Sequence, residues 1–123
     1  MPVATYGLVA LDCTDPEALA AFYQGVLGGE VKRGSDRWYE LHAPGGARLA
    51  FQHAPGHRPP AWPRSDLNSQ QEHLDFRVTD MEAAQREVLA LGAVPLDLDD
   101  RDGERGFRVF ADPAGHPFCL CRS

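Results

Sequence analysis

The sequence predicts an α+β fold built from two tandem βαβββ modules. The first observation behind this prediction is an internal duplication: residues 8–18 align without gaps on residues 73–83, and Thr, Asp, Glu and Ala are identical in both copies. The second is the order of elements, because each copy reads as a strand, a helix and then short strands separated by turns. A repeat of about 60 residues is too long for a solenoid and suits a fold with internal pseudo-twofold symmetry.

In the first copy, residues 6–13 alternate as a strand and residues 16–27 carry one apolar stripe at helical spacing. Asp15 is expected to cap this helix, with Pro16 in its first turn and Gly28 after its end. Three short strands should follow, at residues 30–33, 37–42 and 48–53. The first module therefore covers about residues 4–54, and a proline-rich linker follows at 55–70.

The second copy begins with an alternating strand at residues 72–79. Its apolar side consists of Leu74, Phe76 and Val78, and its polar side of His73, Asp75 and Arg77. A helix over 80–91 with Asp80 as its cap should come next, and further strands are expected at residues 94–98, 106–111 and 117–121. The acidic stretch 97–104 is expected to be a solvated turn. The second module covers about residues 71–122, so the prediction is a single domain over 1–123.

Composition narrows the classes of partner. The chain has 12 basic and 18 acidic side chains, a formal net charge of -6, and no basic run, so nucleic acid is not an expected partner. No apolar run reaches the roughly 20 residues of a membrane span, and no secretory signal is recognisable. We expect a cytoplasmic protein in which Cys13, Cys119 and Cys121 are free thiols.

Several motifs together resemble one family. They are Ala-Phe-Tyr-x-x-Val-Leu-Gly at 21–28, Gln-Gln-x-His-x-Asp at 70–75, Trp62-Pro63 before it, and the Asp-Pro-x-Gly-x-Pro-Phe-Cys ending at 112–119. In this order they resemble the vicinal oxygen chelate superfamily, which contains glyoxalases, bleomycin-resistance proteins and extradiol dioxygenases, and in particular its glyoxalase-like domain branch. The resemblance implies that the two modules form a curved, cup-like mixed sheet with the helices outside.

The resemblance also implies where a divalent metal would sit in such a cup. It places Leu8, Gln52, His73 and Cys119 at the family's ligand positions. Only His73 keeps a family ligand type, and a transition metal normally needs at least three matched protein donors. We therefore expect no cofactor and no ordinary glyoxalase I activity. If a metal binds, its ligands would be His73, Gln52 and Cys119, or an improvised set that includes His42, His53 or Glu40.

Two functions from different classes remain open. The first is a drug- or metabolite-sequestering protein that binds a small organic molecule, through the polar and aromatic side chains of Asp12, Trp38, Gln52, Trp62, His73, Asp75, Arg77 and Cys119. Acidic groups on the cup wall favour a cationic ligand, although Arg77 could instead hold a carboxylate. The resemblance also implies a homodimer.

The second function is a lyase, isomerase or dioxygenase with a non-standard metal site, or an acid/base enzyme that uses His73. Asp75 lies two residues along the same strand, about 6–7 Å away, which is too far to orient His73 without a bend. Cys119 could be a nucleophile only with a lowered pKa, and a small buried residue is the simpler interpretation.

Overall fold

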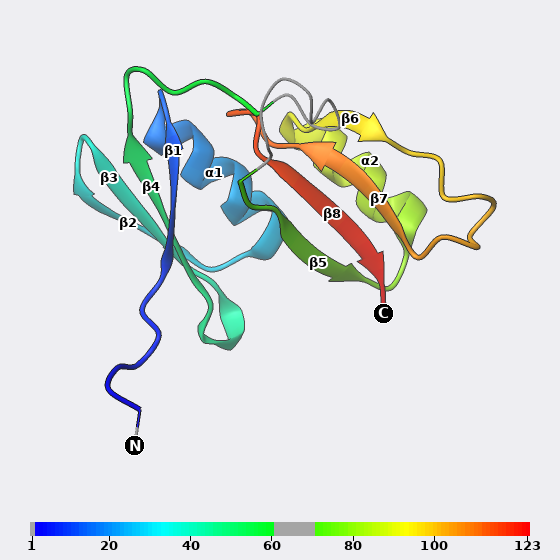
Figure 1. Ribbon diagram of the computed structural model, residues 1–123, viewed down its shortest axis with the longest axis horizontal. Coiled ribbons are helices and arrows are strands. Elements are labelled where there is room, and N and C mark those ends of the chain that lie inside the picture. The colour runs from blue at the N-terminus through cyan, green and yellow to red at the C-terminus, as the bar shows by residue number, and fades with distance from the viewer. Residues whose placement is uncertain (1, 61–70) are drawn as a thin grey trace. The chain divides into compact units, whose positions relative to one another are not determined.

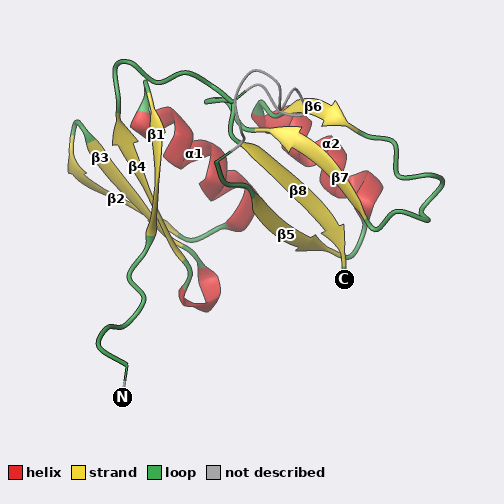
Figure 2. Ribbon diagram, in the orientation of Figure 1, coloured by secondary structure: helices red, strands yellow, loops and turns green. Residues whose placement is uncertain are grey.

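The structure is a computed structural model that describes residues 2–60 and 71–123. The chain divides into two compact units, Met1–His57 and Arg58–Ser123. Each unit contains one four-stranded mixed sheet and one α-helix (Figures 1 and 2). The predicted α+β class and the two βαβββ modules are confirmed.

The first unit orders its strands β1-β4-β3-β2. Its elements are β1 Val9–Cys13, α1 Pro16–Leu27, β2 Glu30–Ser35, β3 Trp38–His42 and β4 Arg48–His53, with a short 3-10 turn at Pro44–Gly46. β1 and β4 are parallel, and β2, β3 and β4 are antiparallel neighbours. The predicted first strand began at residue 6, but the observed one begins at Val9, whose partner on β4 is Leu49 near the start of that strand.

The second unit repeats this plan with the order β5-β8-β7-β6. Its elements are β5 Leu74–Val78, α2 Met81–Leu91, β6 Val94–Asp97, β7 Phe107–Ala111 and β8 Pro117–Arg122. Figure 1 shows the last strand, β8, lying between β5 and β7. Pairing of β5 with β8 is parallel, whereas β6, β7 and β8 pair antiparallel.

Both helices begin as the sequence predicts. The carboxylate of Asp15 accepts a hydrogen bond from the Ala18 amide at 3.1 Å, and that of Asp80 accepts one from the Ala83 amide at 3.1 Å. Each cap satisfies one of the amides that a helix start leaves without an intrahelical partner. Glycines in the positive-φ region follow both helices, at Gly28 (φ 76°) and Gly92 (φ 114°).

Each helix packs on one face of its own sheet, and this layer is the core of the unit. In the first unit Tyr23 of α1 is fully buried and stacks on Phe51 of β4, with ring centroids 5.6 Å apart. In the second unit Phe110 and Phe118 stack at 5.6 Å, and Phe76 contacts Phe118 at 5.7 Å. Apolar side chains therefore occupy the helix-facing side of both sheets, as the alternation predicted.

The duplication extends to strand register. Ala10 is paired with Ala50 in the first unit, and Asp75 with Cys119 in the second. All five residue pairs between β1 and β4 map onto those between β5 and β8 when 65 is added to the first number and 69 to the second. Each position on β1 and β4 therefore has a defined counterpart on β5 and β8, including those without any sequence identity.

Candidate functional site

The face of the second unit's sheet that points away from α2 carries most of the predicted polar residues. Side chains alternate along β5, so Asp75 and Arg77 are exposed on this face while Phe76 points toward the core. Register then places Asp75 beside Cys119 and Arg77 beside Cys121 on β8. We call this surface the open face of the second sheet, and it includes His73, which precedes β5.

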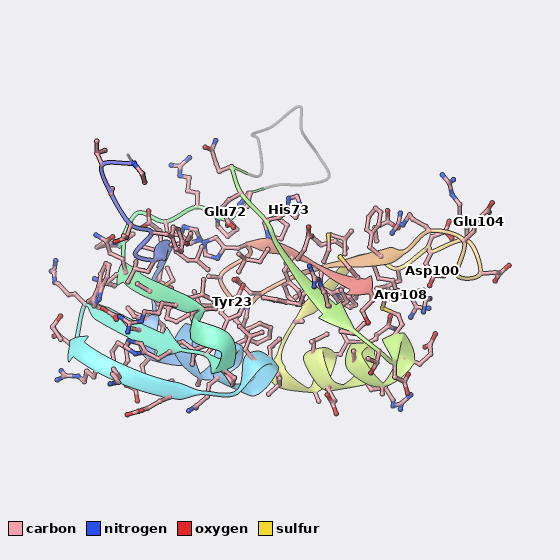
Figure 3. The ribbon with its side chains drawn as sticks, turned by 90° about the horizontal axis from the view of Figure 1, so that it is seen from below. Tyr23, Glu72, His73, Asp100, Glu104 and Arg108 are labelled. Carbon is pink, nitrogen blue, oxygen red and sulfur yellow. The ribbon has the colours of Figure 1, made fainter. Side chains whose placement is uncertain are left out.

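The imidazole of His73 and the carboxylate of Asp75 are in contact at the start of β5. His73 Nε2 lies 3.4 Å from Asp75 Oδ1, and both side chains are exposed, at 41% and 60%. The expectation that these residues were too far apart is therefore wrong. Their backbone spacing is that of neighbours on one strand face, but two side chains that lean toward each other bridge it. Figure 3 shows His73 at the beginning of β5.

The thiol of Cys119 lies close to the side chains of His73 and Asp75. Its residue is 8% exposed, and its ligand atom and those of His73 and Asp75 all lie within 4.8 Å of one another. Burial, followed by the negative charge of Asp75, raises the pKa of Cys119 to about 12. In the absence of a cation, this residue is a thiol at neutral pH, so it lacks the reactivity of a catalytic thiolate.

A second cross-strand row of residues lies on the same face, two residues further along β5. Arg77 is the register partner of Cys121, and Cys121 is the partner of Phe107 on β7. Phe107 is 38% exposed, and the guanidinium of Arg105 lies 4.4 Å from the centroid of its ring. Among residues 2–60 and 71–123, the exposed guanidinium of Arg77 has no ion-pair partner. The row therefore carries a cation on β5 and an exposed aromatic residue on β7, with Cys121 of β8 between them.

The open face of the first sheet carries a different set of predicted residues. One cross-strand row consists of Asp12, Gln52 and Trp38. Along β3, Glu40 accepts a hydrogen bond from Trp38 Nε1 at 2.8 Å, and its other oxygen lies 2.9 Å from His42 Nε2. Hydrogen bonding from Trp38, and then from His42, lowers the pKa of Glu40.

Register corrects one assignment made from the resemblance. The counterpart of Cys119 on the first sheet is Ala50, whereas Gln52 is the counterpart of Cys121. Gln52 therefore does not occupy the position equivalent to Cys119. Trp62 was also a predicted binding residue, and it lies outside the described residues.

Sequence reasoning missed a buried pair in the turn between β7 and β8. His116 was expected on the surface, but it is 7% exposed and its Nδ1 lies 2.9 Å from the carboxylate of Asp112, which is 1% exposed. Asp112 also accepts hydrogen bonds from the amides of Ala114 and His116. The sequence feature that could have indicated this pair is a His four residues after an Asp, with Pro-Ala-Gly between them. These bonds hold the turn that leads into β8.

Glu72 is a half-buried carboxylate close in sequence to β5. Both of its carboxylate oxygens are shielded from solvent, and neither has a hydrogen-bond partner among the described residues. Burial raises the pKa of Glu72, and the nearby charge of His116 opposes that rise. Such a group is costly when it is ionised, because its lost hydration is not replaced.

The acidic stretch 97–104 is not simply a solvated turn. Asp100 is 6% exposed, and one of its oxygens lies 2.9 Å from Arg108 Nη2 and 2.5 Å from Arg122 Nη2. Arg108 also donates to Glu82 and Gln85 on α2, at 2.7 and 2.8 Å. The sequence feature that could have indicated this network is Arg108, because an Arg at a helix-facing strand position needs acidic partners when it is buried. Figure 3 shows Asp100 beside Arg108, with Glu104 further out on the loop.

The fold and the duplicated strand register define a protein of two tandem βαβββ modules. In each module, the face of the sheet that points away from the helix carries polar side chains. The family model described as a glyoxalase-like domain matches residues 8–121. The chain therefore belongs to the glyoxalase-like domain family, within the vicinal oxygen chelate superfamily. No curated protein matches the sequence.

Solved structures share the fold at low identity. The fosfomycin resistance protein FosX from Mesorhizobium loti is 17% identical, with 98% of this chain and 92% of that chain covered and a TM-score of 0.72. A variant of FosX from Listeria monocytogenes, in complex with Mn(II) and 1S,2S-dihydroxypropylphosphonic acid, is 16% identical, with 98% and 90% covered and a TM-score of 0.71. A bleomycin-binding protein in complex with bleomycin is 22% identical, with 98% and 99% covered and a TM-score of 0.58.

The donors on the second sheet do not suit the manganese found in that relative. Mn(II) prefers carboxylate, carbonyl and water oxygens, whereas His73, Asp75 and Cys119 offer one nitrogen, one carboxylate and one sulfur. We therefore derive no step through a manganese ion. Within the described residues, neither helix is long and apolar enough to cross a membrane.

Proposed function

We propose that this protein binds a small organic anion with an apolar body on the open face of its second sheet. The observation that carries the proposal is the cross-strand row formed by Arg77, Cys121 and Phe107, in which a guanidinium that has no ion-pair partner among the described residues shares one sheet face with an exposed Phe. A guanidinium binds carboxylate and phosphonate groups through two parallel hydrogen bonds, and the ring offers apolar surface to the rest of the molecule.

Neighbouring charges favour an anion over a cation at this row. The sequence alone favoured a cationic ligand because of the acidic groups on the cup wall and the acidic net charge, with Arg77 as a group that could pair with Asp75 or hold a carboxylate. The carboxylate of Asp75 lies 3.4 Å from the imidazole of His73, and, after burial, its negative charge helps to raise the pKa of Cys119 and Cys121, whereas Arg77 has no ion-pair partner among the described residues. The phosphonate bound by the FosX variant supports this ligand class, since it is a small organic anion bound by the same fold.

We retain the sequestering role that the sequence suggested, now with a small organic anion as the ligand. The bleomycin-binding relative supports small-molecule binding by this fold. Leu8 and Ala50, at the first-sheet positions that correspond to His73 and Cys119, have no side chain that binds metal, which supports the predicted absence of the family's usual ligand set. Homodimer formation and a cytoplasmic location stay predictions.

A thermal-shift screen of small carboxylates and phosphonates, with organic cations as the comparison set, tests the proposal. A ligand present at 100 times its dissociation constant stabilises the protein by about 2.7 kcal/mol, which is readily detected. Arg77→Ala should weaken binding about 10- to 150-fold, because hydrogen bonds to charged groups contribute about 1.5–3 kcal/mol. Arg86→Ala removes an exposed Arg from α2 and serves as the matched control.

The outcomes of this screen are decisive. Arg77→Lys should give an intermediate affinity, since it keeps the charge but loses the planar fork. Stabilisation by cations alone, lost in Trp38→Ala but kept in Arg77→Ala, would instead place binding on the row of Asp12, Gln52 and Trp38. That result would overturn the proposal.

A second candidate function is acid/base catalysis by His73. The specific observation in its favour is the 3.4 Å contact with Asp75, which orients the imidazole beside the proposed anion row. Its natural reaction is proton abstraction next to the carboxylate or carbonyl of a bound molecule. Exchange of such C–H bonds in D2O, followed by NMR and lost in His73→Ala but not in Arg86→Ala, would establish it. Absence of exchange with every bound ligand would leave sequestration as the function.

A further inference from the structure

The open face of the first sheet carries a hydrogen-bonded row of three side chains along β3. We call Trp38, Glu40 and His42 the β3 triad, because their side chains alternate onto this one face. Trp38 Nε1 donates to Glu40 Oε2 at 2.8 Å, and Glu40 Oε1 lies 2.9 Å from His42 Nε2. One carboxylate therefore holds an indole through one oxygen and an imidazole through the other.

The charge of Glu40 decides which nitrogen of His42 carries the proton. Hydrogen bonds from Trp38 and then from His42 lower the pKa of Glu40, so its carboxylate is ionised at neutral pH and can only accept hydrogen bonds. In the neutral imidazole the proton is therefore on Nε2, and Nδ1 carries the lone pair. Within the described residues, His42 Nδ1 has no hydrogen-bond partner. The β3 triad thus presents an oriented base with one free nitrogen.

This imidazole and carboxylate are held more closely than the corresponding pair on the second sheet. The side chains of His42 and Glu40 are 24% and 28% exposed and 2.9 Å apart, whereas those of His73 and Asp75 are 41% and 60% exposed and 3.4 Å apart. The carboxylate of Glu40 is also fixed by the indole of Trp38. A shorter contact and partial burial favour a fixed orientation of the base, which acid/base catalysis requires.

Strand register places a cation and an anion on either side of His42. Its partner on β4 is Arg48, and its partner on β2 is Glu30. Both are exposed, and among the described residues the guanidinium of Arg48 has no ion-pair partner. A guanidinium in this position can bind the carboxylate of a small molecule through two parallel hydrogen bonds.

These neighbours select proton transfer over acyl transfer. Acyl transfer assisted by a His requires a nucleophile within hydrogen-bond reach of the imidazole, but the neighbours of His42 on this face are Arg48, Glu30 and Glu40, and none is a hydroxyl or thiol. Within the described residues, His42 and Glu40 also belong to no group of three metal-binding side chains. A base beside a guanidinium instead suits removal of a proton from a carbon acid that carries a carboxylate.

From this geometry we propose that His42 is the general base of a site that abstracts a proton from a small 2-oxo acid, with Arg48 binding the substrate carboxylate and Glu40 as the positioning residue. Nδ1 of His42 takes a proton from C3, and the electron pair of the broken C–H bond forms the enolate. The positive charge of Arg48 stabilises that enolate. Return of a proton from Nδ1 to C3 regenerates the 2-oxo acid, so the cycle consumes no further reactant.

This site lies within the first unit and requires no residue of the second. It goes beyond the anion binding proposed for the second sheet and does not depend on it.

Hydrogen exchange of pyruvate and 2-oxobutyrate in D2O tests the proposal with the full-length protein. NMR measures the loss of the C3 hydrogen signals, and free imidazole at the same concentration as the protein is the reference. We expect saturable exchange at least about 100-fold faster than with imidazole, the lower end of the contribution of a positioned general base. His42→Ala should remove this acceleration. Exchange no faster than with free imidazole would overturn the proposal.

Two further variants separate the roles of the residues around the base. Glu40→Gln should lower kcat for exchange about tenfold or more with little change in KM, because the amide keeps the size of the side chain but removes a charge-assisted hydrogen bond to the imidazole. Arg48→Ala should raise KM as well, by about 10- to 150-fold, because the substrate carboxylate loses its partner. An unchanged kcat in Glu40→Gln would contradict the positioning role, and an unchanged KM in Arg48→Ala would contradict the carboxylate site.

Matched His variants distinguish the proposed base from general damage. His53→Ala removes a half-buried imidazole from β4, on the opposite face of the sheet from Arg48, and should leave exchange unchanged. Circular dichroism and melting curves confirm that each variant is folded. Exchange that is lost in His73→Ala but kept in His42→Ala would assign the base to the second sheet and overturn the proposal.

Failure of this proposal and failure of anion binding are distinguishable. Anion binding is measured by thermal shift and responds to Arg77→Ala, whereas exchange is measured by NMR, responds to Arg48→Ala and should be unchanged in Arg77→Ala. A protein that binds anions through Arg77 but accelerates no exchange contradicts only the base at His42, and the reverse result contradicts only the anion site.

Discussion

The two units have the same strand register but carry different chemistry on equivalent positions. Where the second sheet has His73, Asp75 and Cys119, the first has Leu8, Ala10 and Ala50. The backbone plan is therefore preserved by helix packing and strand pairing, which do not depend on the side chains of the open face. Among the described residues, the cluster of His73, Asp75 and Cys119 occurs in the second unit alone.

The faces of the two sheets that pack against the helices also differ. Tyr39 on β3 and Arg108 on β7 occupy counterpart positions, and each reaches a Glu in the first turn of its helix. Tyr39 donates to Glu17 at 3.2 Å, and Arg108 donates to Glu82 at 2.7 Å. A single hydrogen bond from a hydroxyl to a carboxylate in one unit thus corresponds to a branched ion-pair network in the other.

Removal of that network should have the largest effect on stability. Arg108→Met should lower the free energy of unfolding by about 3 kcal/mol, the lower end for breaking a buried ion pair, because Asp100 keeps Arg122 as a partner. Tyr39→Phe, its counterpart, should cost only about 0.5–1 kcal/mol because Glu17 remains hydrated. Urea denaturation of both variants measures the difference. Equal losses would show that the two contacts are equivalent despite their chemistry.

Glu72 has no acidic counterpart, since residue 7 is Gly7. Its raised pKa means that the folded state holds the proton more tightly than the unfolded state, so stability increases as pH falls through the folded pKa toward the unfolded value of about 4.3. At neutral pH, Glu72→Gln should therefore stabilise the protein by about 1 kcal/mol. Below about pH 4 this advantage should disappear. Denaturation midpoints of both proteins across this pH range provide the measurement, and a constant difference would contradict the assignment.

Removal of the helix caps should give the smallest difference in stability loss between the two units. Asp15→Ala and Asp80→Ala each remove one cap with the same 3.1 Å geometry, so each should cost about 1 kcal/mol. Melting curves of the two variants should shift equally. A large inequality would mean that one helix contributes more to folding than its duplicate.

Much of the fold could be read from local pattern. The alternation in β5 and the Asp-Pro and Asp-Met helix starts depend on residues close in sequence, and both caps are where they were predicted. The polar side chains of His73, Asp75 and Arg77 were also assigned to the correct face, since strand periodicity alone decides it.

Contacts between distant segments could not be read in this way. The partners of Arg108 come from α2 and from the loop before β7, and the sequence offered no means to choose them among the acidic residues. His116 was expected on the surface because its neighbours are polar and turn-forming, yet the carboxylate of Asp112 allows its burial.

The sequence by itself determined the duplicated modules, the helix boundaries and the side of each strand that faces water, because these follow from short-range periodicity and capping. Only the tertiary structure decided that Asp75 lies close to both His73 and Cys119 while Arg77 has no ion-pair partner among the described residues. The physical reason is that strand register and side-chain direction fix distances of a few ångströms between β5 and β8, and residue order does not specify them.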